Sequence, residues 1–155
     1  AISLMIENKF DKLDFKKFHP AGNLAKKLKT ASDIMLTGNK IPFINENMTM
    51  KDSLKELDLK KQGFLVVTNK KGLTKGVFTD GDLKRLMQKK HIINNLKIKN
   101  FITKNPFVVK ANTLATEILA QMNKRKITNV CVYDNKNKRK TIGIIHIHNL
   151  INLIK

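Results

Sequence analysis

The feature of this sequence that most limits its fold is an internal repeat with an offset of 67 residues. The segment 76–83 (GVFTDGDL) lies 67 residues before 143–150 (GIIHIHNL), and 33–35 (DIM) lies the same distance before 100–102 (NFI). Between these anchors the offset slips by about three residues and then recovers, in polar stretches at 37–40 and 135–140. Because loops tolerate insertions, we expect both stretches to be loops. Two copies of one fold account for this pattern.

Both halves predict the same order of elements, β-α-β-β-α, and hence an α/β (α+β) chain. A proline-led extended segment precedes a helix with apolar residues three and four apart, and two β-rich runs and a last helix follow. In the first half these elements fall at 42–44, around Met50, Leu54 and Leu57, at 64–67, at 76–79 and from Asp80. In the second half they fall at 106–109, around Leu114, Ile118 and Met122, at 129–133, at 142–145 and from His148. One copy has too small a core to be stable, so we expect two copies to pack sheet to sheet.

Threonines precede the first helix of each half. Thr49 and Thr113 stand where a hydroxyl can accept a hydrogen bond from a free backbone N–H, so we expect both to be helix caps.

The net charge of +19 raises the question of nucleic-acid binding, because clustered cations release counterions from phosphates. The basic residues, however, are 28 lysines and three arginines, and Lys, Asn and Ile together make 62 of the 155 residues. A/T-rich codons would impose that composition on any protein. Readers of nucleic acids use arginine and aromatic side chains, whereas Trp is absent here and Tyr133 is the sole tyrosine. We therefore expect a solvated surface, with a basic nucleic-acid-binding module as the third interpretation.

Three classes of protein are excluded by simple counts. No run approaches the roughly 18 apolar residues of a membrane helix, so no membrane partner is expected. Residues 1–10 show no basic head followed by an apolar block, so no secretory signal is visible. The single cysteine, Cys131, excludes a disulfide framework and a multi-cysteine zinc site, and we expect it to be a small buried hydrophobe. These features favour the cytoplasm.

The ordered motifs resemble those of the cystathionine-β-synthase (CBS) domain, which normally occurs as a tandem pair. The resemblance rests on DIM at 33–35, a proline-led strand, a helix, two strands and GVFTDGD at 76–82, and it covers residues 31–155. It implies one CBS repeat at 31–90 and another at 97–155, related by a pseudo-twofold axis. It also implies that two chains associate through their helices, as a homodimer or a tetramer.

The flanking segment is similar to one enzyme family in particular. Residues 18–28 (FHPAGNLAKKL) resemble the His-Pro-Gly-Gly junction of arabinose-5-phosphate isomerases, with Ala21 and Ala25 in place of two glycines. Those enzymes join a sugar isomerase (SIS) domain to a CBS pair. The resemblance implies that this chain, which starts at Ala1, is a fragment in which residues 1–30 are a remnant of the SIS domain and a linker. It also implies interconversion of D-ribulose 5-phosphate and D-arabinose 5-phosphate, which supplies Kdo for lipopolysaccharide.

His19 is the catalytic residue that this resemblance implies. Aldose–ketose isomerisation needs a base that moves a proton between carbons, and a lone histidine before proline would otherwise be a structural residue. The remainder of such a site would lie on the missing part, so we expect this fragment to be inactive alone.

Thr79 and Asp82 are the first candidates for ligand binding. Their spacing is nearly that of a capping box and is sufficient to start a helix. The same strand end also offers free backbone N–H groups to a phosphate and a carboxylate to ribose hydroxyls, the roles that the CBS resemblance implies. Both interpretations can hold together, whereas Asp80 is expected to be a cap alone.

In the second half His146 and Asn149 replace Thr79 and Asp82. Asn149 keeps a hydrogen-bonding oxygen but lacks the charge, which leaves room for a different nucleotide. His146 and His148 alternate as in a strand, so both imidazoles would lie on one face of the cleft between the repeats. Zinc could use that geometry, but a third ligand is missing nearby, so no metal site is expected.

The predicted function is therefore regulatory, with no required cofactor. The candidate ligands are an adenine nucleotide or a product of the pathway such as CMP-Kdo, and the partner is the chain's own SIS domain. Ligand in the cleft would shift the packing of the pair on that domain. The second interpretation is a stand-alone CBS protein that senses adenine nucleotides.

Overall fold

The computed structural model describes residues 28–89 and 93–154. The first repeat contains strand β1 (Phe43–Asn45), helix α4 (Met50–Lys60), strands β2 (Phe64–Thr68) and β3 (Thr74–Thr79), and helix α5 (Asp80–Gln88). Strand β1 pairs parallel to β2, and β2 pairs antiparallel to β3. Helix α4 is the crossover that two parallel neighbouring strands require, and a short turn suffices between β2 and β3.

The second repeat has the same order of elements and the same strand pairing. It contains strand β5 (Val108–Lys110), helix α6 (Ala115–Arg125), strands β6 (Asn129–Asp134) and β7 (Asn137–His146), and helix α7 (Ile147–Ile154). Strand β5 is parallel to β6, and β6 is antiparallel to β7. The predicted β-α-β-β-α unit is thus confirmed in both halves, as a mixed α/β fold with two sheets.

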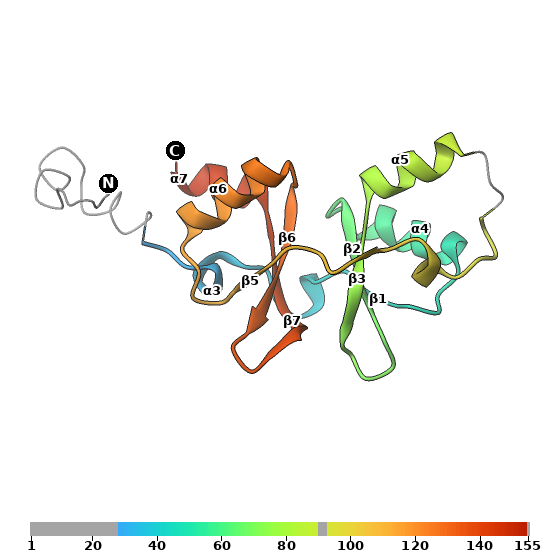
Figure 1. The fold of residues 1–155 in the computed structure, drawn as a ribbon, viewed down its shortest axis with the longest axis horizontal. Helices are drawn as coiled ribbons and strands as arrows, with labels where there is room; N and C mark the ends of the chain where they lie inside the picture. Colours follow the sequence, from blue (N-terminus) through green and yellow to red (C-terminus); the bar gives the residue numbers. More distant parts are fainter. Residues whose placement is uncertain (1–27, 90–92, 155) are drawn as a thin grey trace, which may run out of the picture.

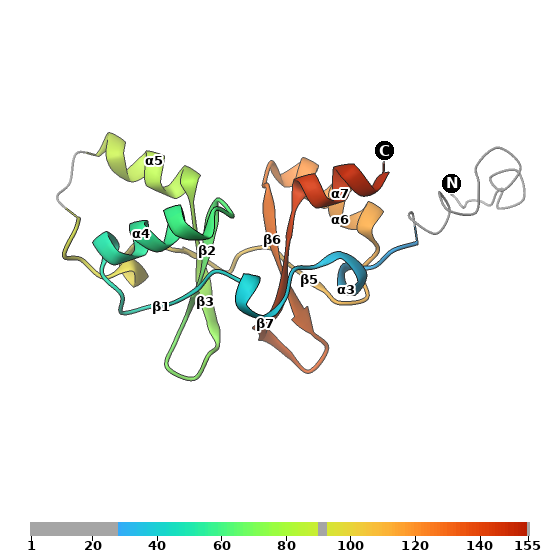
Figure 2. The same cartoon turned by 180° about the vertical axis from the view of Figure 1, so that it is seen from behind.

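The two sheets face each other at the centre, and each repeat places its two helices on the outer side of its own sheet (Figures 1 and 2). A cluster of buried side chains from both repeats joins the sheets: Ile41, Phe64, Val66, Val77, Cys131 and Ile144. Burial of apolar surface between the sheets is what couples the repeats. The hydroxyls of Thr74 and Thr141, 67 positions apart, lie 2.6 Å from each other. Since a residue that touches its own equivalent lies on a twofold axis, the pseudo-twofold passes between them.

The residues that open each repeat in the sequence pack against the opposite repeat in space. Helix α3 (Ala31–Ile34) joins the core of the second repeat, where the N–H of Ala31 donates to the carbonyl of Thr113 at 2.8 Å. In the same way Ile98 is fully buried in the core of the first repeat, and strand β4 (Thr103–Lys104) extends its sheet beside β3. The rear view shows the chain running from α3 across to β1 (Figure 2). Neither repeat therefore completes its core alone.

Three local expectations are wrong. The stretch 135–140 is not a loop, because Asp134 accepts the N–H groups of Lys136 and Asn137, both at 3.0 Å, and so closes a tight turn from which β7 starts at once. Thr113 is not a cap: helix α6 starts after Leu114, which has no capping oxygen, whereas Thr49 does accept the N–H of Asp52 at 3.2 Å. Helix α7 begins at Ile147, one residue before His148.

Candidate functional site

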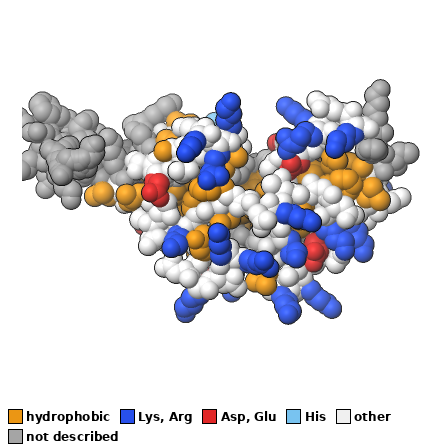
Figure 3. All heavy atoms as spheres, in the orientation of Figure 1, with side chains coloured by type: hydrophobic (Ala, Val, Ile, Leu, Met, Phe, Trp, Pro, Cys, Tyr) orange, Lys and Arg blue, Asp and Glu red, His pale blue; other side chains and the backbone are white. Residues whose placement is uncertain are grey.

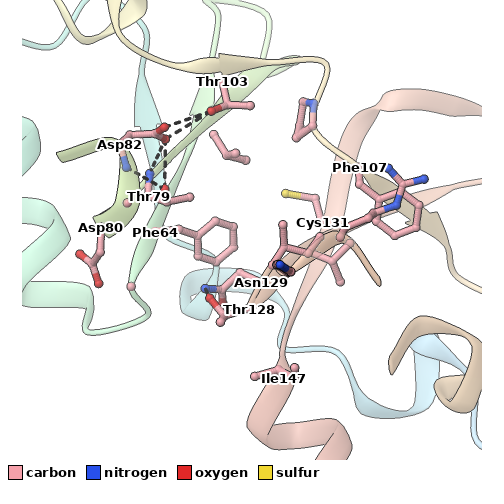
Figure 4. Close-up of a pocket in the computed structure, with 18 of the residues that line it drawn as sticks. Phe64, Thr79, Asp80, Asp82, Thr103, Phe107, Thr128, Asn129, Cys131 and Ile147 are labelled. Carbon is pink, nitrogen blue, oxygen red and sulfur yellow. Dashed lines mark hydrogen bonds between the residues drawn. The ribbon is translucent and has the colours of Figure 1, made fainter. Parts of the chain in front are cut away.

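A cleft of about 720 Å³ opens where the strand ends of the two repeats meet. The first repeat contributes the start of β2 and the β3–α5 junction, and the second contributes the end of α6, the start of β6 and the β7–α7 junction. The segment Thr103–Phe107, which comprises β4 and the link to β5, closes one side. The close-up shows Thr79, Asp82 and Thr103 across this space from Asn129, Cys131 and Phe107 (Figure 4). The volume is that of a pocket for a nucleotide-sized molecule.

Thr79 and Asp82 form a full capping box at the start of α5. The N–H of Thr79 donates to Asp82 Oδ2 at 2.9 Å, and the N–H of Asp82 donates to Thr79 Oγ1 at 3.2 Å. Both residues also line the cleft, so the cap and the predicted ligand site coincide. Asp80 is not the cap; it is the first residue of the helix, and its side chain also lines the cleft.

The carboxylate of Asp82 is largely occupied by the protein itself. Arg85, one helical turn further on, forms an ion pair with Oδ1, and the hydroxyl of Thr103 donates to the carboxylate at 3.3 Å (Figure 4). A carboxylate has about four lone-pair sites, and these contacts use them. A ribose hydroxyl that reaches Asp82 must therefore displace Thr103 or Arg85, whose side chain is 67% exposed.

In the second repeat an equivalent cap at the start of α7 is made by different side chains. The N–H of His146 donates to Asn149 Oδ1 at 3.0 Å, as that of Thr79 does to Asp82, and the N–H of His148 donates to His146 Nδ1 at 3.0 Å. The two imidazoles stack, with ring centroids 4.7 Å apart. They meet because the first turn of α7 folds back over the end of β7, and not through strand alternation as the sequence suggested. Burial lowers the pKa of His146, and repulsion by His148 lowers it further.

Several cleft residues lie outside the motifs that the sequence singled out. Arg85 follows Asp82 by three residues on α5, a helical spacing that could have revealed it. Arg125 lies 4.0 Å over the ring of Phe107, so a cation and an aromatic face form one wall. Asn129 Oδ1 is buried without a hydrogen-bond partner at the same place. Thr103, Phe107 and Asn129 lie far along the chain from Asp82, and no local pattern marks them.

The structure brings four of the predicted site residues to one cleft: Thr79, Asp82, His146 and His148. Asn149 caps α7 and does not line the cleft. His19 lies outside the described residues. Among residues 28–89 and 93–154, no group of three metal-ligating side chains occurs. Cys131 is buried as predicted, and burial raises the pKa of its thiol to about 12, so it is a wall of the cleft and not a nucleophile.

A model of the CBS domain matches the sequence twice, at residues 31–89 and 98–155. The chain belongs to the CBS domain family. Its two matched segments form a tandem CBS pair, as the resemblance implied.

Solved CBS structures share this fold at low sequence identity. CBSX2 in complex with AMP matches with a TM-score of 0.67 and 23% identity, over 79% of this chain and 93% of that one. The CBS pair of protein MJ0100, in complex with 5′-methylthioadenosine and S-adenosyl-L-methionine, matches with a TM-score of 0.69 and 21% identity, over 81% and 95%. An Agrobacterium tumefaciens CBS-domain protein gives a TM-score of 0.71 at 18% identity, over 81% and 93%.

Curated relatives include the arabinose 5-phosphate isomerase KdsD of Yersinia pestis, 35% identical over 152 residues, and that of Escherichia coli K12, 34% identical over 152 residues. The match takes in 97% of this chain but only 45% of each relative. The chain thus spans less than half the length of these enzymes. No helix in the described part of the chain has the length and apolar character needed to cross a bilayer.

Proposed function

We propose that this CBS pair binds a nucleotide or sugar nucleotide in the cleft between its repeats. The observation that carries the proposal is the meeting, in one cleft of about 720 Å³, of the Thr79–Asp82 cap with Arg85 and the Thr103–Phe107 segment. Helix α5 begins at the cleft, and the positive end of its dipole favours a phosphate there. The carboxylate of Asp82 suits ribose hydroxyls, and the wall formed by Phe107 and Arg125 can pack against a base.

A ligand in the cleft can also change the relative position of the two repeats. The walls of the cleft come from both repeats, so ligand contacts bear on their relative position. A ligand shifts such an arrangement only if it binds one state more tightly than the other. The AMP and S-adenosyl-L-methionine complexes of structurally similar CBS pairs support adenine nucleotides as first candidates. CMP-Kdo is the sugar-nucleotide candidate.

Titration calorimetry with AMP, ATP and CMP-Kdo tests this binding. Asp82→Asn removes the charge but keeps an oxygen that can accept the N–H of Thr79, as Asn149 accepts that of His146 in the second repeat. We expect this variant to weaken binding about tenfold, since a hydrogen bond to a charged group contributes about 1.5–3 kcal/mol. Asp52→Asn, on the exposed face of α4, is the matched control and should change nothing. Failure of all three ligands to bind would contradict the proposal.

We further propose that the parent protein is an arabinose-5-phosphate isomerase and that the CBS pair regulates it. The similarity to the isomerases of Yersinia pestis and Escherichia coli over 97% of this chain supports this proposal. The test is an assay of D-ribulose 5-phosphate and D-arabinose 5-phosphate interconversion by the full-length protein, with and without the cleft ligand. His19→Ala should reduce the rate, whereas Asp82→Asn should change only its response to ligand. A parent protein without isomerase activity would favour the stand-alone nucleotide sensor.

A further inference from the structure

A second groove, of about 570 Å³, lies on the side of the molecule that carries the two β-hairpins. Its walls are the segment from Lys99 to Pro106, the start of β3 at Thr74 and Lys75, and the first half of β7. Only Asn105 and Pro106 also line the cleft described above, so the two spaces share a thin wall and are otherwise separate.

The groove is strongly basic. Five cationic side chains line it, and Glu46 is its single acidic residue. The cations are Lys75, Lys99, Lys104, Lys138 and Arg139. Among residues 28–89 and 93–154, the one ion pair between side chains joins Arg85 to Asp82, away from this groove. Lys and Arg side chains accordingly dominate the lower half of the face in Figure 3, where few acidic ones lie.

These cations come together only in the folded protein. They belong to three separate parts of the chain: β3 of the first repeat, the segment that crosses between the repeats, and β7 of the second repeat. The hydroxyls of Thr74 and Thr141 lie among them, 2.6 Å apart on the pseudo-twofold axis. One of the two hydroxyls donates to the other.

We propose that this groove binds a small anion carrying two or more phosphate groups. Like charges gathered in one concave space repel each other, so an anion that neutralises several of them is favoured over one that neutralises a single charge. Lysine ammonium groups bind phosphate as point charges and need no fixed orientation of the anion. A single orthophosphate would leave most of the groove's charge uncompensated.

The lining also excludes recognition of a base. None of the thirteen residues that line the groove is aromatic, so a nucleobase finds no face on which to stack. Arginine, which reads base edges in pairs of hydrogen bonds, is present once, as Arg139. At about 570 Å³ the groove has the volume of a small-molecule site. The phosphate groups are therefore the part of the ligand that this site recognises.

Calorimetric titration of the 155-residue chain with sodium tripolyphosphate, at constant ionic strength, tests the proposal. We expect binding, with orthophosphate at least about tenfold weaker. The double variant Lys75→Gln/Lys138→Gln removes one cation from each repeat and should weaken tripolyphosphate binding by about tenfold or more. Glu46→Gln removes the opposing charge and should strengthen binding. These opposite effects would not arise from general damage to the fold.

The matched control is Lys55→Gln/Lys124→Gln, which makes the same change in net charge on the exposed faces of α4 and α6. This variant should bind tripolyphosphate like the natural sequence. An equal loss in the control would show that only net charge matters and would overturn the proposal. Unchanged binding in the groove variant would place the anion elsewhere and would also overturn the proposal. A single-stranded RNA oligonucleotide that binds the groove more tightly than tripolyphosphate would overturn it as well.

Measuring the affinity for AMP and for tripolyphosphate in both variants shows whether the cleft and the groove are separate sites. If AMP binds in the cleft, the groove variant should leave its affinity unchanged, and Asp82→Asn should leave tripolyphosphate binding unchanged. A parallel loss of both ligands in the groove variant would mean one extended site and would contradict a separate one.

Discussion

His146 makes the stability of the protein depend on pH. Its pKa lies below the ordinary value of 6.5 because burial penalises the imidazolium and because the neighbouring His148 repels it. The unfolded chain therefore binds more protons than the folded one between pH 6.5 and the lowered pKa. The contribution of His146 to the free energy of unfolding is therefore fully present above pH 6.5. It decreases as the pH falls below that value.

Thermal melting from pH 8 to pH 5 measures this effect. We expect the melting temperature to fall on acidification. His146→Thr should reduce the slope of melting temperature against pH. The threonine hydroxyl keeps an oxygen that can cap α7, as Thr79 caps α5. An identical slope in the variant would show that His146 is not the responsible group.

Two equivalent glycines, Gly76 and Gly143, mark the places where the opening segments cross to the opposite repeat. A Cβ on Gly76 would collide with the backbone carbonyl oxygen of Thr103. A Cβ on Gly143 would collide with the side chain of Met35, whose sulfur and Cγ can turn away although its Cβ is fixed to the backbone. We expect Gly76→Ala to cost about 1–3 kcal/mol of unfolding free energy and Gly143→Ala to cost less.

Urea unfolding of the two variants measures which substitution costs more unfolding free energy. Gly81→Ala is the control, because its Cβ would have only ordinary contacts and alanine favours the helix by about 0.5–1 kcal/mol. A larger loss for Gly143→Ala than for Gly76→Ala would contradict the interpretation of the crossing points.

At the scale of elements, the first helices of the two repeats differ in how they begin. Thr49 caps α4 through the N–H of Asp52, whereas Leu114 at the same place before α6 offers no oxygen and is 41% exposed. We expect Thr49→Ala to lower the unfolding free energy by about 1 kcal/mol and Leu114→Thr to raise it by up to about 1 kcal/mol. Both changes are measured by urea unfolding, and a loss in both variants would contradict the capping argument.

The last helices show that one cap serves two purposes. In α5 the Thr79–Asp82 box stabilises the helix start and also faces the cleft, whereas in α7 the cap made by His146 and Asn149 leaves Asn149 outside the cleft. The two halves of the pair therefore present different chemistry to a ligand although their backbones are equivalent.

At the scale of the whole molecule, the repeats should unfold as one unit. Their shared cluster holds Phe64 from the first repeat and Cys131 and Ile144 from the second, and each opening segment completes the core of the other repeat. Phe64→Ala should cost about 3–5 kcal/mol, and the cost should appear in both repeats at once.

Tyr133, the chain's only tyrosine, lies on β6 and reports on the second repeat by fluorescence, whereas far-ultraviolet circular dichroism reports on both. The two signals should give coincident urea transitions in the natural chain and in Phe64→Ala. Loss of the first repeat with an unshifted Tyr133 transition would show that the repeats are independent.

The sequence by itself determined the duplicated β-α-β-β-α unit, the caps at Thr49 and Thr79 and the burial of Cys131. Hydrophobic periodicity and capping are local, and they act within a few residues of the chain. Only the tertiary structure decided that each opening segment crosses to the other repeat and that Thr103 bonds to the carboxylate of Asp82. It also decided that lysines from three distant segments surround one groove. These outcomes depend on packing between segments about 20 to 70 residues apart, and such contacts leave no period in the sequence from which they could be read.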